Sequence, residues 1–199
     1  ASIMLNKKLY PEYDFRRIRL DNRCMESLNE YSNLDNFSFD CQKEIRFFQN
    51  TELLNQADII FLSNTWELFN NKNVFNFVNS IKNKNILIMG TGNFNDLTSL
   101  SLSIAKNKIL PDERAKFFYQ NIRSDWRKSS LDLQKQVSQL SNVRYLDKLE
   151  VFCRLEIMEC NLFSNENDPY IFDSGHVTVE GAVLFGEKIA EFNWLKEIN

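Results

Sequence analysis

Histidine is nearly absent from this sequence, because His176 is the only one among 199 residues. If the protein uses an imidazole for acid–base chemistry at neutral pH, His176 must be that group. A cluster of metal ligands is missing as well. No pair among Cys24, Cys41, Cys153 and Cys160 has the short spacer, two to four residues, of a structural zinc site. We therefore expect neither a metal nor an organic cofactor.

Long apolar runs and clustered positive charge are also missing. No run approaches the roughly 20 apolar residues that a membrane helix needs, and the N-terminus lacks the charged-then-apolar order of a signal peptide. The net charge is −3 and the lysines are scattered, so the sequence has no electrostatic footprint for nucleic acid. We expect no membrane span in the sequence as given and no nucleic-acid binding.

The composition is otherwise that of an ordinary globular protein. Only 3 prolines are present, and there is no internal repeat or low-complexity tract. Hydrophobic residues make up 43% and charged residues 26% of the chain. These values fit one compact domain over residues 1–199.

The clearest structural pattern lies in the middle of the chain. Residues 58–62 and 85–89 are short apolar runs, typical of strands buried in a parallel sheet. Residues 67–81, between them, carry apolar side chains at helical spacing. Strand, helix and strand with short connections indicate a three-layer α/β fold.

The remaining elements are read from the same periodicities. We expect helices over residues 1–10, 42–54 and 113–140, a strand over 15–20, a loop over 21–40, a loop over 90–96 and a last strand over 143–146. The loop over 90–96 follows a buried strand, which is where open α/β sheets place ligands. It lacks the motif of a phosphate-binding loop.

The loop around His176 is the strongest functional signal. Asp173 precedes the histidine by three residues, so its carboxylate can fold back onto Nδ1, fix the tautomer and leave Nε2 free to accept a proton. Thr178 stands at an N-cap position and Glu180 in the first helical turn. Apolar residues then recur at helical spacing up to Phe192. This pattern predicts a loop anchored at a helix start.

The segment Asp173-x-x-His176-Val-Thr-x-x-Gly181-Ala182, followed by an apolar helix, resembles the last conserved block of the SGNH/GDSL hydrolases. In particular it is similar to the SGNH domains that work with membrane acyltransferase-3 proteins to O-acylate bacterial surface glycans. The resemblance implies a flavodoxin-like α/β/α fold with a mostly parallel sheet. It also implies that Asp173 and His176 belong to a Ser-His-Asp triad.

The four cysteines fit either two disulfides in an oxidising compartment or four buried thiols. The segment from Cys153 to Cys160 resembles a cysteine pair of the acyltransferase-linked domains, which implies a bridge between these two residues. A second bridge would join Cys24 to Cys41. Together with the resemblance, the cysteines indicate the periplasm or the outer face of a bacterial envelope.

The nucleophile of the family is not evident, because no Gly-Asp-Ser motif occurs in the chain. Two interpretations remain. In the first, the strand and its serine lie upstream of residue 1, and residues 1–9 are the helix that follows them. In the second, Ser2 is the nucleophile of a degenerate motif. We favour the first, because a sheet without its central strand leaves unpaired edges.

The oxyanion block of the family, Gly-x-Asn-Asp, is not clearly present either. Asn64, at the end of a predicted strand that resembles the family, is the first candidate donor, and Asn93 is the second. Trp66 is a candidate substrate contact at the same strand end. Each amide is also consistent with an ordinary loop.

The resemblance implies serine-dependent transfer of an acyl group, in particular acetyl, to a cell-surface polysaccharide through an acyl-serine. The expected partners are an acylated glycan or acyl donor and a membrane acyltransferase-3 domain in the same or a partner chain. Two alternatives stay open. One is a free carbohydrate esterase of the same fold, and the other is a non-catalytic glycan-binding or scaffold domain without the nucleophile.

Overall fold

The computed structural model describes residues 11, 14, 42–43, 52–63, 68–81, 83–90, 94, 97–173 and 176–192. The chain divides into two compact units. We call residues 15–90 and 128–146 the sheet unit, and residues 1–14, 91–127 and 147–199 the histidine unit.

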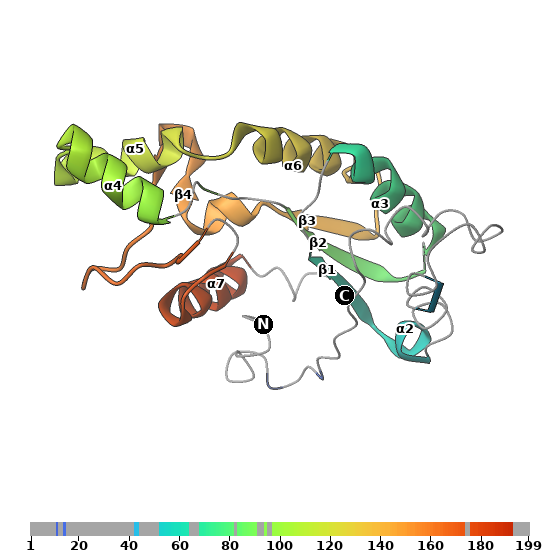
Figure 1. Ribbon diagram of the computed structural model, residues 1–199. Helices are drawn as coiled ribbons and strands as arrows, with labels where there is room; N and C mark the ends of the chain where they lie inside the picture. The colour runs from blue at the N-terminus through green and yellow to red at the C-terminus, as the bar shows by residue number, and fades with distance from the viewer. Residues whose placement is uncertain are drawn as a thin grey trace. The chain divides into compact units, whose positions relative to one another are not determined.

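The sheet unit contains a parallel three-stranded sheet (Figure 1). Its strands are β1 (Ile59–Ser63), β2 (Asn85–Met89) and β3 (Val143–Leu146), in the order β1-β2-β3. The register pairs Ile60 with Ile86, and Ile88 with Tyr145. The middle strand β2 is buried on both faces, which explains why its apolar run is continuous and not alternating.

Two helices cover one face of this sheet. Helix α3 (Leu68–Ser80) connects β1 to β2, and α6 (Ser124–Val137) leads toward β3. The core between them and the strands contains Ile60, Val74, Phe77, Val78, Ile86, Ile88, Leu133 and Val137. The helices and the parallel strands confirm the predicted α/β class.

A buried polar contact joins α3 to the part of α6 that lies in the sheet unit. Asn71 is fully buried, and its Nδ2 donates to the carbonyl oxygen of Ser129 at 2.8 Å and to Oδ2 of Asp132 at 2.8 Å. A buried amide left without such partners costs about 1–3 kcal/mol, so this contact fixes how the two helices pair.

The single long helix expected over residues 113–140 is wrong. The structure has a 3₁₀ turn η4 (Pro111–Glu113), helix α5 (Arg114–Gln120), and a break before α6. Asn121 ends α5, since its Nδ2 donates to the carbonyl oxygen of Phe117 at 2.9 Å, and Ile122 forms a bridge with Phe94. An asparagine side chain that bonds to the backbone competes with helix continuation.

Two further elements were not expected. Helix α4 (Leu97–Asn107) follows β2, and the short antiparallel strands β4 (Cys153–Arg154) and β5 (Glu159–Cys160) follow β3. Residues 143–146 are therefore not the last strand. The serine-rich sequence of α4 obscured its period, although Leu97, Leu100 and Ile104 have helical spacing.

Several expected elements cannot be compared with the structure. The predicted helix over 1–10, the strand over 15–20 and the loop over 21–40 lie entirely outside the described residues. Of the helix expected over 42–54, residues 42–43 are helical, and helix α2 (Glu52–Gln56) includes the last predicted residues and continues to Gln56.

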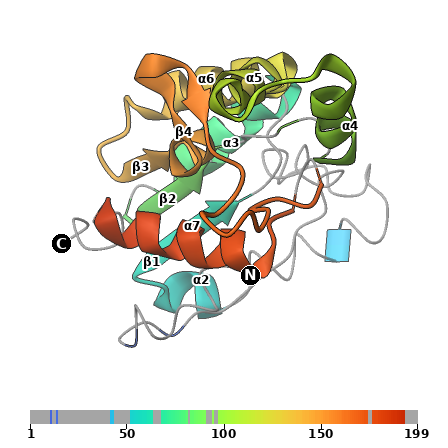
Figure 2. The same cartoon turned by 90° about the vertical axis from the view of Figure 1, so that its left-hand side faces the viewer.

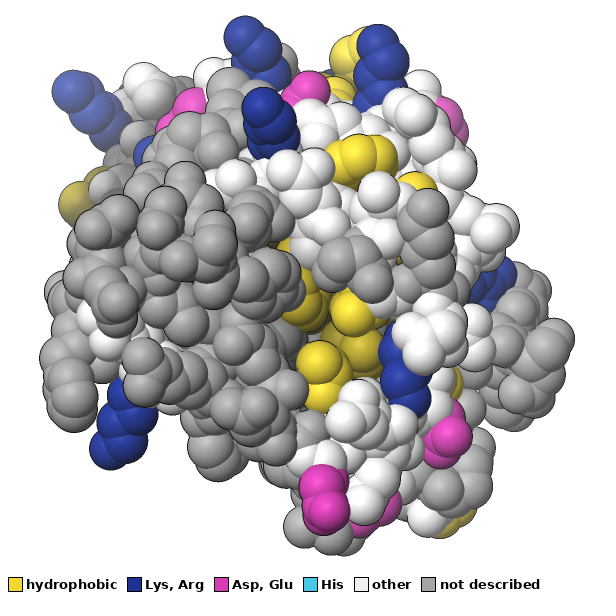
Figure 3. Space-filling view, turned by 90° about the vertical axis from the view of Figure 1, so that its right-hand side faces the viewer, with side chains coloured by type: hydrophobic (Ala, Val, Ile, Leu, Met, Phe, Trp, Pro, Cys, Tyr) yellow, Lys and Arg dark blue, Asp and Glu magenta, His cyan; other side chains and the backbone are white. Residues whose placement is uncertain are grey.

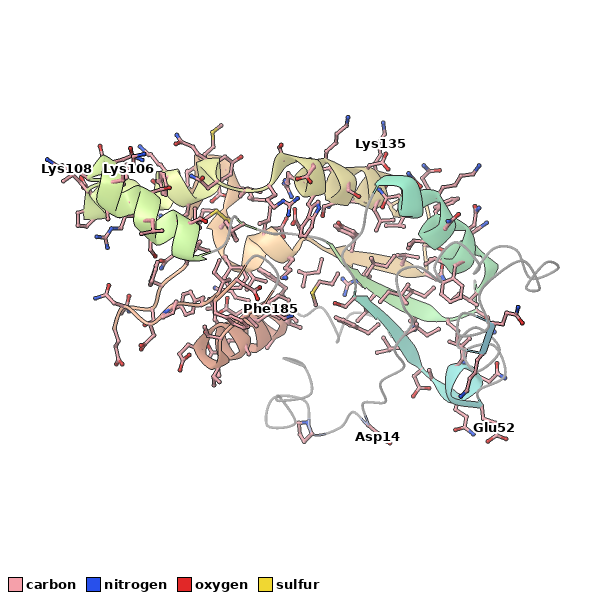
Figure 4. All side chains as sticks on the ribbon, viewed as in Figure 1. Asp14, Glu52, Lys106, Lys108, Lys135 and Phe185 are labelled. Carbon is pink, nitrogen blue, oxygen red and sulfur yellow. A yellow bond between two sulfur atoms is a disulfide. The ribbon has the colours of Figure 1, made fainter. Side chains whose placement is uncertain are left out.

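The histidine unit contains α7 (Val179–Glu191), which Figure 2 shows in the foreground. The helix packs against the 3₁₀ turn η5 (Lys148–Val151), and a second such turn, η6 (Leu155–Ile157), lies between β4 and β5. The inner face of α7 carries Ala182, Phe185 and Ile189, all buried; Phe185 is labelled in Figure 4.

Candidate active site

The predicted contact between Asp173 and His176 is present in the structure. Nδ1 of His176 lies 2.9 Å from Oδ1 and 2.8 Å from Oδ2 of Asp173. The backbone N–H of His176 also donates to Oδ1 at 2.8 Å, so the same carboxylate binds the residue at two points. Among the described residues no hydrogen bond reaches Nε2. This geometry leaves Nε2 as the nitrogen that can take a proton from another molecule or side chain.

The pair is open to solvent. The side chain of His176 is 73% exposed and that of Asp173 is 39% exposed. The ring of Phe172 stacks on the imidazole, with centroids 5.5 Å apart and planes inclined by 19°. The imidazole therefore has a carboxylate at Nδ1 and an aromatic ring along one side.

The backbone around the pair is fixed at both ends of the loop. Ile171 and Val177 form an antiparallel bridge, and the N–H of Thr178 donates to the carbonyl oxygen of Tyr170 at 3.0 Å. Oγ1 of Thr178 donates to the carbonyl oxygen of Pro169 at 2.6 Å and accepts from the N–H of Gly181 at 3.0 Å. The second contact confirms the predicted N-cap, which satisfies one of the free donors at the start of α7.

Gly181 allows the first turn of α7 to lie against the backbone of Tyr170, which precedes the loop. A Cβ at position 181 would lie 1.9 Å from the carbonyl oxygen of Tyr170. We expect Gly181→Ala to lower the free energy of unfolding by about 1–3 kcal/mol or more, because backbone must move to admit the methyl group. Urea denaturation measures this change.

The matched control for this substitution is Val183→Ala on the same helix. Val183 is exposed, so its truncation should change the free energy of unfolding by no more than about 0.5 kcal/mol. Equal stabilities of the Gly181→Ala and Val183→Ala proteins would show that the helix start tolerates the methyl group.

A lysine that sequence analysis did not single out lies near the pair. Burial lowers the pKa of Lys148, at the start of η5, and the charge of Asp173 opposes this shift by raising it. Asp147 fixes the start of this turn, since its Oδ1 accepts from the N–H of Leu149 at 3.0 Å and its carboxylate pairs with Arg127. The sequence does not indicate that Lys148 and Asp173 lie close together, because they are distant in the chain and only folding brings them near each other.

The structure contains the expected disulfide between Cys153 and Cys160 (Figure 4). The two residues face each other across the β4 and β5 pair, and both are buried. The alternative of free buried thiols is therefore wrong for these two cysteines. Cys24 and Cys41 lie outside the described residues.

The other predicted site residues, Ser2, Asn64, Trp66 and Asn93, also lie outside the described residues. The nucleophile and the oxyanion donors therefore stay predictions.

Within the part of the chain that the structure describes, no group of three His, Cys, Asp or Glu side chains could hold a metal ion. In the same part, no helix is long and apolar enough to cross a membrane. On the face drawn in Figure 3, Lys and Arg side chains are spread and do not form one patch.

Most of the chain matches the model of one protein family. Residues 17–191 match the model of the SGNH domain that is fused to AT3 domains. The chain belongs to this family. The matched region contains both Asp173 and His176 of the SGNH domain.

A comparison with solved structures agrees on the fold. The SGNH domain is similar to the periplasmic domain of the lipopolysaccharide acetyltransferase of Salmonella ser. Paratyphi A, with a TM-score of 0.57 and 14% sequence identity. The similarity covers 76% of this chain and 62% of the Salmonella chain. This chain therefore spans less than two thirds of the length of the Salmonella chain. A search among curated proteins found no significant match. At this identity the similarity shows a shared fold.

Proposed function

We propose that this SGNH domain transfers an acyl group, in particular acetyl, to a hydroxyl of a bacterial cell-surface polysaccharide through an acyl-serine. The observation that carries the proposal is the contact of the Asp173 carboxylate with Nδ1 of His176, at 2.8 and 2.9 Å. It supports a general base at Nε2, held in one tautomer by its carboxylate partner. The family and the acetyltransferase fold are in accord with this chemistry.

The first half of the reaction forms the acyl-serine. The serine Oγ attacks the carbonyl carbon of an acyl ester while its proton passes to Nε2 of His176. The tetrahedral intermediate collapses as Nε2 returns the proton to the leaving alcohol, and the acyl group stays on the serine. Asp173 orients the imidazole and balances its positive charge. Within the given sequence the candidate for this serine is Ser2, which stays a prediction.

The second half releases the acyl group. Nε2 of His176 accepts a proton from the hydroxyl of a sugar, whose oxygen attacks the acyl carbonyl carbon. The intermediate then collapses and the serine oxygen recovers the proton. Attack by water in place of the sugar would give the esterase reaction, so exclusion of water decides between transfer and hydrolysis.

The proposed setting is the periplasm or the outer face of a bacterial envelope. The disulfide between Cys153 and Cys160 is in accord with an oxidising compartment. SGNH domains of this family are fused to AT3 domains, which supports a membrane acyltransferase-3 domain, in the same or a partner chain, as the source of the acyl group.

The experiment that tests the proposal is covalent labelling with a fluorophosphonate, which traps activated serines. We expect one serine of the full chain to be labelled and mass spectrometry of its peptides to identify it. A version of the protein denatured before labelling is the control for non-specific reaction. Absence of any labelled serine in the native protein would contradict the proposal and favour a non-catalytic glycan-binding role.

A further inference from the structure

Lys148 carries a half-buried ammonium group near the Asp173 carboxylate. Burial lowers the pKa of this ammonium, and the charge of Asp173 opposes that shift. With the described residues the ammonium forms neither a hydrogen bond nor a direct ion pair. A charge removed from water costs free energy unless an opposite charge lies near it. The carboxylate of Asp173 is the negative charge that acts on this lysine and offsets part of that cost.

The two carboxylates on the lysine's own segment are engaged elsewhere. Asp147 uses Oδ1 to accept from the N–H of Leu149 at 3.0 Å, and its carboxylate pairs with Arg127. Glu150 is exposed, so solvent screens its charge. Neither of them replaces the loop carboxylate as the partner of the ammonium.

Packing fixes the turn η5 beside the segment that leads into the catalytic loop. Leu149 and Val151 of this turn are buried, and the turn packs against α7. The ring of Phe152, which ends the turn, lies 6.4 Å from that of Tyr170 between centroids. The carbonyl oxygen of Tyr170 in turn accepts from the N–H of Thr178, on the other side of the loop. The start of η5 therefore has a fixed place relative to the loop without any contact from the lysine itself.

From these observations we propose that Lys148 is a positioning residue that acts through Asp173. Its ammonium attracts the carboxylate toward the protein, where the carboxylate contacts Nδ1 of His176, and so favours the tautomer with a free Nε2. Asp173 is 39% exposed, so water competes for its carboxylate and an attraction from the protein side limits its motion. The role rests on the proposed function, because the tautomer matters only if His176 is the base.

The kinetic test replaces the ammonium by an uncharged side chain. Lys148→Met keeps an apolar stem of similar length and should lower kcat for p-nitrophenyl acetate about fivefold, the factor that one ion pair near a surface can supply, with KM little changed. A cation also opposes the positive charge that the imidazole gains, but solvent screens this effect at the exposed pair. Lys148→Arg keeps the charge and should retain kcat within about twofold.

The spectroscopic test uses the ring ¹⁵N signals of His176, which stand alone in the NMR spectrum because no other histidine is present. In Lys148→Met part of the molecules should carry the ring proton on Nε2, so the two nitrogen shifts should move toward each other. In Lys148→Arg the signals should stay as in the wild type. In an Asp173→Asn background, Lys148→Met should cause no further change, because the lysine acts through the carboxylate.

Lys106→Met is the matched control. Lys106 lies on α4 in the same unit, is exposed and is labelled in Figure 4. Its replacement removes the same charge from the protein at a position away from the loop. Both kcat and the ¹⁵N signals of His176 should therefore stay as in the wild type.

Three results would overturn the role of Lys148. They are unchanged ¹⁵N signals in Lys148→Met, equal losses of kcat in Lys148→Met and Lys148→Arg, or the same spectral change with and without the Asp173 carboxylate. The second result would show that the shape of the side chain matters and not its charge. Absence of hydrolysis in the wild-type protein would count against the proposed function alone, because the nitrogen signals do not depend on turnover.

Discussion

Replacement of His176 by Ala should lower kcat for hydrolysis of p-nitrophenyl acetate by about 10⁴-fold or more in the full chain. His176 is the only histidine, and its Nε2 accepts no hydrogen bond from the described residues, so no second imidazole can take over the proton transfer. In serine hydrolases, removal of the base costs about as much as removal of the whole triad. Stopped assays with a chromogenic ester measure this loss directly.

The control for His176→Ala is Glu187→Ala, an exposed substitution on α7 that leaves the loop untouched. It should keep kcat within about twofold, since surface changes away from a site are close to neutral. Near-normal turnover of the His176→Ala protein would remove the proposed base from the mechanism.

Replacement of Asp173 by Asn should have an effect of similar size. The carboxylate of Asp173 accepts at both Oδ1 and Oδ2 from Nδ1 of His176, whereas an amide can place its NH₂ group there and favour the wrong tautomer. In a Ser-His-Asp triad this change lowers kcat by about 10⁴ while the geometry stays intact. We therefore expect kcat to fall by about 10⁴ in Asp173→Asn, with KM little changed.

The matched control for this substitution is Asp168→Asn, on the same segment. Asp168 is exposed, and its backbone oxygen, which the substitution retains, accepts from the N–H of Ser164 at 2.8 Å. The Asp168→Asn protein should hydrolyse the ester at the wild-type rate within about twofold. A kcat loss shared equally by both variants would indicate a general effect of charge and not a specific role of Asp173.

The parts of the fold that could be predicted are those determined by local sequence. The run over β2 is apolar without interruption because this strand lies between β1 and β3 and is buried on both faces of the parallel sheet. The contact of Asp173 with His176 follows from a separation of three residues, and Thr178 caps α7 through its own side chain. These features could be predicted because the residues that interact lie close together in the sequence.

Features that depend on distant residues could not be predicted. The break between α5 and α6 arises where Ile122 pairs with Phe94, far away in the chain, although the helical period continues across it. The proximity of Lys148 to Asp173 likewise follows from the fold. The stacking of Phe172 is local, but an aromatic residue next to a loop is more often part of the core. Sequence reasoning therefore had no reason to select it.

The most direct test of the account is the tautomer of His176, measured by ¹⁵N NMR on the full chain at a pH where the imidazole is neutral. The single histidine gives one pair of ring nitrogen signals, so the assignment is unambiguous. We predict a proton on Nδ1, donated to Asp173, and an unprotonated Nε2 available as the base. A proton found on Nε2, with Nδ1 bare, would contradict the central claim that Asp173 prepares His176 for catalysis.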